Sequence, residues 1–223
     1  DEARPDVTVT RWWWVRHAPV TTDGGRIYGQ TDLPGDTSDT VCYPALAEAL
    51  PEKVVLVTSH LRRTHDTAAA IAAAGRDLPE AIVSHAFAEQ HFGEWQGQPR
   101  AEIRARHGHE HGLWLAPAHV APPGGESFVD LAERVGAAID EFNRVFAGAD
   151  ILAVAHGGTI RAAIGHALGL APDRAIRFAI DNCSLTRLDH LAPPGAPPGT
   201  PIGAAEALEP AWRVDRVNST PWR

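Results

Sequence analysis

Cysteine is scarce in this sequence, with only Cys42 and Cys183 in a chain of 223 residues. The two are far apart, which excludes a Cys-x-x-Cys metal or redox motif and gives no sign of a disulfide framework. We therefore predict a reduced, cytoplasmic protein. Methionine is absent even from the first position, which leaves open whether residues precede Asp1.

Long hydrophobic runs and an excess of positive charge are also missing. The apolar run over residues 7–15 is too short and too interrupted to cross a bilayer or to act as a signal peptide. The formal net charge is −8, whereas nucleic acids and anionic membranes favour proteins rich in Lys and Arg. We therefore expect neither as a partner, and the sequence leaves the oligomeric state undetermined.

The remaining pattern predicts an α/β fold. Hydrophobic residues make up 44% of the chain, enough for one sizeable core. Apolar strands alternate with helices, which favours three layers: a mostly parallel central sheet with helices on both faces. We expect strands at residues 9–15, 53–58, 81–84, 151–155, 184–189 and 212–217, and helices at residues 40–50, 63–74, 127–146 and 159–168.

Further local features refine this organisation. Ser127 is expected to cap the helix that follows it. The three tryptophans at residues 12–14 are expected to form a packed strand with one exposed ring. We expect one domain over residues 1–223, with an insertion at about 97–125 and a Pro/Gly-rich loop at about 192–210.

The Arg16-His17 pair is the first indication of a functional site, because it follows the apolar strand near the start of the sequence. Open α/β sheets bind their ligands at the carboxyl ends of such strands. A guanidinium matches phosphate oxygens with its two-pronged donors, and a neutral imidazole nitrogen can attack phosphorus. The pair alone is also what two polar residues that leave a strand by chance would look like.

Three further segments carry complementary chemistry. Residues 58–63 (Thr-Ser-His-Leu-Arg-Arg) and residues 155–159 (Ala-His-Gly-Gly-Thr) each lie between an expected strand and an expected helix. The N–H groups and dipole of the second helix favour an anion. Residues 88–97 (Ala-Glu-Gln-His-Phe-Gly-Glu-Trp-Gln-Gly) follow a third expected strand.

In order, the motifs Arg-His, Ser-x-Leu-x-Arg, Glu-x-x-x-Gly-x-Trp-x-Gly and Ala-His-Gly-Gly resemble the histidine phosphatase superfamily over residues 9–188. The resemblance implies that His17 is the nucleophile, that Arg16 and Arg63 clamp the phosphate, and that His156 is the second histidine. It places the proton donor at Glu89, with Glu94 in the same loop as the alternative. The family's usual Gly and hydroxyl residues are replaced here by Ala18 and Val20.

The implied activity is a metal-independent phosphomonoesterase that forms a phosphohistidine on His17. Positive charge around the equatorial oxygens supplies most of the catalysis of phosphoryl transfer, so we expect no cofactor and no metal. The Gly-x-Trp-x-Gly ending resembles the phosphatase branch. The alternatives are a cofactor-dependent phosphoglycerate mutase and a non-enzymatic phosphate-binding protein.

The substrate beyond its phosphate is expected to be a small metabolite whose identity stays open. Gly157, Tyr28 and Gln30 are candidate substrate-binding residues, together with Arg16, Arg63 and His156. In the family, insertions like that at residues 97–125 cover the active site. The candidates within this one are Arg100, Arg104, Arg106, Trp114 and His119, and its alternating His107, His109 and His111 lack a further ligand to complete a familiar metal site.

Overall fold

A six-stranded sheet forms the centre of the computed structural model, which describes residues 7–107, 112–193 and 211–222. The strands are β1 (Thr8–Arg16), β2 (Val55–Thr58), β3 (Ile82–Val83), β4 (Asp150–Ala155), β5 (Leu185–Ala192) and β6 (Ala211–Ser219), in the order β3-β2-β4-β1-β5-β6. The pairs β3-β2, β2-β4 and β4-β1 are parallel, and β5 is antiparallel to both β1 and β6. The mostly parallel sheet expected from the sequence is confirmed.

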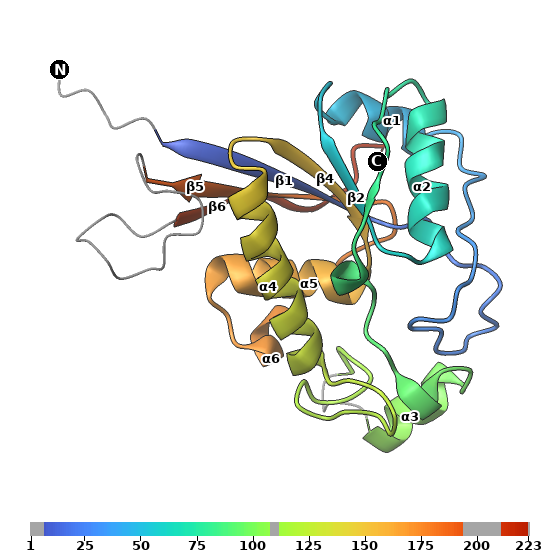
Figure 1. Ribbon diagram of the computed structural model, residues 1–223. Coiled ribbons are helices and arrows are strands. Elements are labelled where there is room, and N and C mark those ends of the chain that lie inside the picture. Colours follow the sequence, from blue (N-terminus) through green and yellow to red (C-terminus); the bar gives the residue numbers. More distant parts are fainter. Residues whose placement is uncertain (1–6, 108–111, 194–210, 223) are drawn as a thin grey trace.

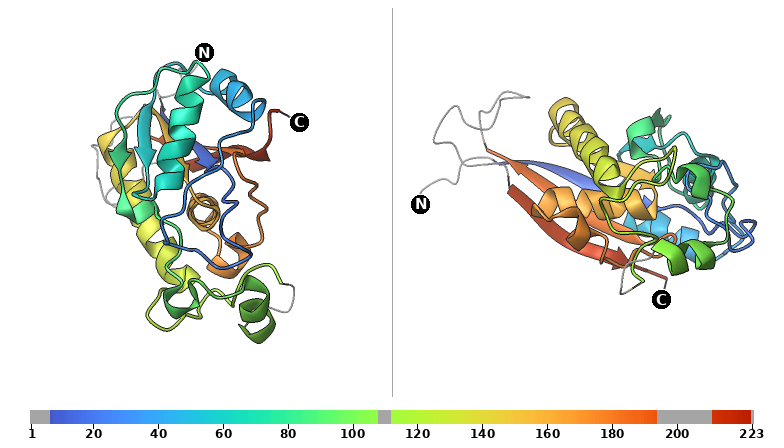
Figure 2. Two further views of the ribbon diagram at one scale, coloured as in Figure 1. Left: turned by 90° about the vertical axis from the view of Figure 1, so that its right-hand side faces the viewer. Right: turned by 90° about the horizontal axis from the view of Figure 1, so that it is seen from below.

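Helices cover both faces of this sheet, as Figures 1 and 2 show. One face packs against α4 (Phe128–Val145), α5 (Gly157–Leu168) and the short α6 (Pro172–Ala175), and the other against α1 (Cys42–Ala49) and α2 (Arg62–Ala73). The alternation of side chains along β1 divides the core, because Trp12 and Trp14 join the first cluster while Trp13 and Val15 join the second.

The expectation that one of the three tryptophans is exposed is wrong. Trp12 and Trp14 stack at 5.0 Å and are fully buried. Trp13 on the other face is only 8% exposed, because the Arg187 guanidinium carbon lies 4.6 Å from its ring centroid and its Nε1 donates to Asp150 Oδ1 at 2.8 Å. Contacts from neighbouring strands supply this cover.

The helix α3 (Arg100–His107) was not expected from the sequence. Of its residues only Ile103 is buried, so it lacks the apolar stripe by which an amphipathic helix is recognised. Figure 1 shows α3 set apart from the sheet. Ile103 packs in a separate small cluster with Ile27, Phe92 and Trp95, which joins residues 97–125 to the loop after β1. The single domain with an insertion stays a prediction.

The two cysteines, distant in sequence, belong to the same hydrophobic cluster and are free and buried.

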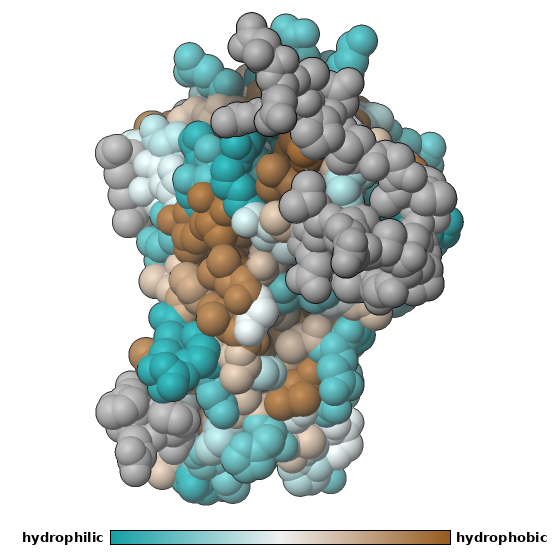
Figure 3. All heavy atoms as spheres, turned by 90° about the vertical axis from the view of Figure 1, so that its left-hand side faces the viewer, coloured by the Kyte–Doolittle hydropathy of each residue, from teal (hydrophilic) through white to brown (hydrophobic). Residues whose placement is uncertain are grey.

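Most of the predicted 192–210 loop lies outside the described residues, and Ala192 ends β5. No helix in the described ranges is both long and apolar enough to cross a membrane. Figure 3 shows a band of apolar surface on the side that lies to the left in Figure 1.

The first turn of α4 begins with the predicted cap. The Asp130 N–H donates to Ser127 Oγ at 3.1 Å, and the Ser127 N–H donates to Asp130 Oδ2 at 2.8 Å. This reciprocal pair satisfies N–H groups that a helix start leaves without partners.

Replacing Ser127 by Ala is therefore expected to lower the free energy of unfolding by about 1 kcal/mol, because the Asp130 N–H loses its acceptor. Urea unfolding followed by circular dichroism measures the change. Thr37→Ala, at an exposed loop position, serves as the control and should change stability much less. Equal stability of the two variants would contradict the capping role.

Candidate active site

The carboxyl ends of three neighbouring parallel strands meet at one edge of the sheet. Arg16 ends β1 and lies beside Ala155, which ends β4. His17 and His156 follow directly and bring their ring centroids to 5.1 Å. The β2 strand on the far side of β4 leads to Ser59 and the start of α2. The order of the strands thus gathers three of the four motifs.

His17 is held as a neutral imidazole with a defined tautomer. Its Nδ1 lies 2.6 Å from the carbonyl oxygen of Ala18, and since a carbonyl only accepts, Nδ1 carries the proton and Nε2 the lone pair. Burial lowers the pKa of His17 well below its usual value, and the positive charges of Arg63 and Arg16 lower it further. The Asn182 amide donates to the His17 carbonyl at 2.9 Å and fixes the backbone here.

His156 is fully buried and hydrogen-bonded on one side only. Its Nε2 pairs with Ser59 Oγ at 2.8 Å, while Nδ1 has no partner among the described residues. Burial is the main cause that lowers the pKa of His156 well below the usual value, followed by the charge of Arg63 and then His17. With the Ser59 hydroxyl donating to Nε2, the Nδ1 atom of His156 carries the proton and can donate it to an anion.

The two arginines predicted as phosphate clamps are anchored to backbone carbonyls. Arg16 Nη1 donates to the Ile180 carbonyl at 2.6 Å. Arg63 donates through Nη1 to the Thr31 carbonyl at 3.0 Å and through Nη2 to the Gly29 carbonyl at 2.6 Å. In each, the buried Nε has no partner in the described part of the chain, so each keeps a donor for an anion.

Glu89 lies against the start of α5. Its Oε2 accepts from the Gly158 N–H at 3.2 Å and its Oε1 from the Gln90 N–H at 2.9 Å. The Glu89 carbonyl accepts from the side chains of Gln30 at 2.9 Å and Arg134 at 3.1 Å. The carboxyl group is therefore held at a helix N-terminus by a fixed backbone.

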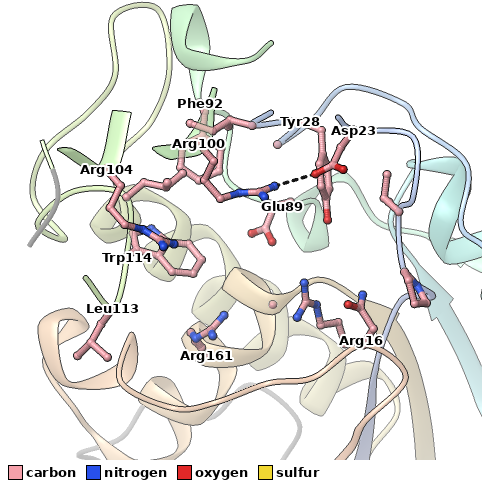
Figure 4. Close-up of a pocket in the computed structure, with 17 residues that line it drawn as sticks. Arg16, Asp23, Tyr28, Glu89, Phe92, Arg100, Arg104, Leu113, Trp114 and Arg161 are labelled. Atoms are coloured by element: carbon pink, nitrogen blue, oxygen red, sulfur yellow. Dashed lines mark hydrogen bonds and ion pairs between the residues drawn. The ribbon is translucent and has the colours of Figure 1, made fainter. Parts of the chain in front are cut away.

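A cavity of about 390 Å³ opens over these residues (Figure 4). Of the residues predicted from the sequence, those that line it are Arg16, Tyr28, Glu89, Arg100, Arg104, Trp114 and Gly157. His17, Arg63 and His156 are buried and are not lining residues. The Tyr28 ring is in contact with two of them, edge-on to His17 at 6.4 Å and beneath the Arg63 guanidinium at 4.9 Å.

Several other candidates lie elsewhere. Gln30 does not line the cavity and instead supports the Glu89 backbone through its amide. Arg106 pairs with Glu102 on the surface, and His119 is exposed. Glu94 is likewise exposed, as a charged loop residue usually is.

The insertion histidines give no metal site that can be described. His107 stacks on the Trp95 ring with centroids 4.8 Å apart, whereas His109 and His111 lie outside the described residues. Within the described ranges, no group of three or more His, Cys, Asp or Glu side chains is arranged to hold a metal ion.

Sequence reasoning missed Arg161 and Asn182, which both line the cavity. Arg161 stands four residues after Gly157 on α5, about one helical turn from the anion-binding start, and this spacing was the available signal. Asn182 lies in an irregular segment between α6 and β5, and no periodicity marks it.

Comparison with known proteins decides the family. A family model described as the histidine phosphatase superfamily, branch 1, matches residues 12–192. The chain belongs to this superfamily. The resemblance proposed from four short motifs is thus confirmed over more than half of the sequence.

Two relatives bear on the type of histidine phosphatase. The chain is 32% identical over 226 residues to glucosyl-3-phosphoglycerate phosphatase of Mycolicibacterium vanbaalenii, covering 95% of this chain and 96% of the relative. It is 35% identical over 188 residues to 2,3-bisphosphoglycerate-dependent phosphoglycerate mutase 2 of Gloeobacter violaceus, covering 80% and 84%. Similarity to the phosphatase extends along more of both chains, which supports a hydrolase over a mutase.

Solved structures show the same likeness. The native structure of mycobacterial glucosyl-3-phosphoglycerate phosphatase matches with a TM-score of 0.74 at 28% identity, covering 95% of this chain and 99% of that one. A structure described as mycobacterial hydrolase 2 matches with a TM-score of 0.76 at 28% identity, covering 96% and 92%. Both likenesses extend over nearly the whole length of this chain.

The two glycines at the start of α5 yield a prediction about site geometry. A methyl group added at Gly158 would overlap Glu89 Oε1 and approach Leu131 Cδ2 to 3.0 Å, whereas one at Gly157 would meet the terminal Nη1 of Arg161, at 2.9 Å, as its nearest neighbour. Gly158→Ala is therefore expected to displace the Glu89 carboxylate and to lower kcat/KM about tenfold or more relative to Gly157→Ala.

Steady-state kinetics of both variants test this, with thermal unfolding to show that each folds. Overpacking at Gly158 is also expected to cost about 1–3 kcal/mol of stability. Equal kcat/KM for the two variants would argue against tight packing of Glu89 on the helix start.

Proposed function

We propose that this histidine phosphatase is a metal-independent phosphomonoesterase that acts through a phosphohistidine on His17. The observation that carries the proposal is the state of His17: it is neutral, its Nδ1 proton is bound by the Ala18 carbonyl, and its Nε2 lone pair is free to attack. Arg16 and Arg63 lie close enough to depress its pKa, and the Glu89 carboxyl group lines the adjoining cavity.

In the first step, His17 Nε2 attacks phosphorus, an N–P bond forms, and the bond between phosphorus and the ester oxygen breaks. The Glu89 carboxyl group transfers a proton to the departing alkoxide. Arg16, Arg63, His156 and the Gly157 N–H supply positive charge and hydrogen-bond donors to the equatorial oxygens.

In the second step, water attacks the phosphohistidine, the N–P bond breaks, and phosphate leaves. The Glu89 carboxylate accepts a proton from the water, which restores both residues to their starting forms. Since His17 is only 1% exposed, the reaction takes place away from bulk water, and a dry site strengthens every charge interaction within it.

A small phosphorylated metabolite fits the cavity of about 390 Å³, which is larger than a phosphate group. The likeness to glucosyl-3-phosphoglycerate phosphatase along nearly the whole chain makes that ester the first substrate to test. The similarity to a phosphoglycerate mutase keeps transfer to a second hydroxyl as the alternative activity. We also propose a cytoplasmic location, supported by two free, buried thiols.

The test of this function is phosphate release from p-nitrophenyl phosphate at mildly acidic pH with excess chelator. The native chain should be equally active with and without chelator, and His17→Ala should be at least about a thousandfold slower. His119→Ala, an exposed histidine away from the cavity, is the matched control and should stay fully active.

A ³²P-labelled substrate quenched in alkali should leave label on His17, because phosphohistidine survives base. Dependence on added metal would overturn the mechanism. Phosphoryl exchange that requires 2,3-bisphosphoglycerate, with little hydrolysis, would establish the mutase instead.

The acid role of Glu89 predicts a dependence on the leaving group. Glu89→Gln should slow hydrolysis of an alkyl ester such as glycerol 3-phosphate by about 100-fold or more, because its alkoxide needs a proton. The rate of p-nitrophenyl phosphate hydrolysis should fall by less than about tenfold, since p-nitrophenolate leaves without taking up a proton. Glu94→Gln is the control at an exposed carboxylate. Equal losses on the two substrates would remove Glu89 from the acid role.

A further inference from the structure

Arg161 is one of four arginines that line the cavity, and it does so from the first turns of α5. Its Nε donates to the Phe178 carbonyl at 2.7 Å, and its guanidinium carbon lies 5.0 Å from the Trp114 ring centroid. Figure 4 shows its end directed into the cavity, between Arg16 and Trp114. The two contacts restrain the guanidinium group, one through Nε and one through the Trp114 ring.

Arg161 has no direct counter-ion in the part of the chain that the structure describes. It forms no ion pair in the described residues, and its two terminal nitrogens donate to no acceptor there. Burial, followed by the charge of Arg16, lowers the pKa of Arg161 to about 10, with Glu89 opposing the shift in part. A partly desolvated cation without a counter-ion is costly, so a ligand anion is the expected partner.

Binding of the substrate phosphate does not require the positive charge of Arg161. A phosphate dianion is matched by Arg16 and Arg63, and the helix start adds further donors. Arg161 therefore adds a positive charge beyond those that match the phosphate. Arg104 on α3 lines the same cavity and forms no ion pair in the described ranges. Arg100 differs, because it is paired with Asp23 at 3.0 Å.

We propose that Arg161 binds a carboxylate of the substrate, next to the phosphoryl group, and so selects phosphomonoesters that carry a second anionic group. The free Nη1 and Nη2 atoms present two donors in the geometry that matches the two oxygens of a carboxylate. Trp114 holds the guanidinium from the insertion side, which couples residues 97–125 to substrate choice. This inference rests on the proposed phosphatase function.

The experiment compares two substrates that differ only at the distal group: 3-phosphoglycerate, which has a carboxylate, and glycerol 3-phosphate, which has a hydroxymethyl group there. A charge-assisted hydrogen-bonded pair predicts that the native chain prefers 3-phosphoglycerate by about 10- to 100-fold in kcat/KM. Arg161→Met should bring this ratio down to near one, mainly by raising KM for 3-phosphoglycerate.

Arg161→Lys keeps the charge but not the pair of donors. Its ratio of kcat/KM for the two substrates should therefore lie between those of the native chain and Arg161→Met. Arg177→Met, an exposed arginine, is the matched control and should keep the native ratio. Thermal unfolding of each variant shows whether it folds, and the preference of the native chain tests the inference without any variant.

The outcomes separate the two proposals. A native ratio near one, with hydrolysis of p-nitrophenyl phosphate intact, overturns the carboxylate subsite and leaves the phosphatase standing. Equal loss on both substrates in Arg161→Met also overturns it, because Arg161 would then act on the phosphoryl group or on the fold. Failure of the native chain to hydrolyse any of the three esters is failure of the proposed function itself.

Discussion

The parallel alignment of β2, β4 and β1 is the constraint on which this site depends. Their carboxyl ends meet at one edge, so residues more than a hundred positions apart, such as His17 and His156, are brought to a ring separation of 5.1 Å. The buried tryptophans of β1 hold both helical layers to that strand. Any loosening of this register would separate the residues proposed for phosphoryl transfer from one another.

Within that frame, burial sets the chemistry of the side chains. His17 and His156 are both neutral because they are withdrawn from water beside arginines that carry positive charge. The arginines are tolerated because backbone carbonyls accept from their terminal nitrogens. Anchoring through those atoms leaves the Nε groups as free donors, so the same hydrogen bonds that make burial possible also prepare an anion site.

The segment over residues 97–125 forms part of the cavity wall opposite the sheet edge. It packs through a small cluster of its own onto the loop after β1, and its Trp114 meets Arg161 of α5. The end of the cavity next to Arg16 and Gly157 therefore comes from the sheet and a helix start, and the other end comes from residues 97–125. This division is consistent with relatives of one fold that differ in the names of their substrates.

Among the described residues, the sequence by itself determined the six strands, four of the six α-helices and the five residues proposed for phosphoryl transfer, because apolar periodicity and short motifs lie in neighbouring positions. It did not predict α3, whose residues are mostly polar, the four-residue α6, or the burial of Trp13 beneath an arginine of another strand. Only the tertiary structure showed that Arg161 and Asn182 line the cavity and that Gln30 does not line it but donates through its amide to the Glu89 carbonyl. These outcomes depend on pairings between distant segments, and no local pattern in a chain specifies which distant group will complete a cavity wall.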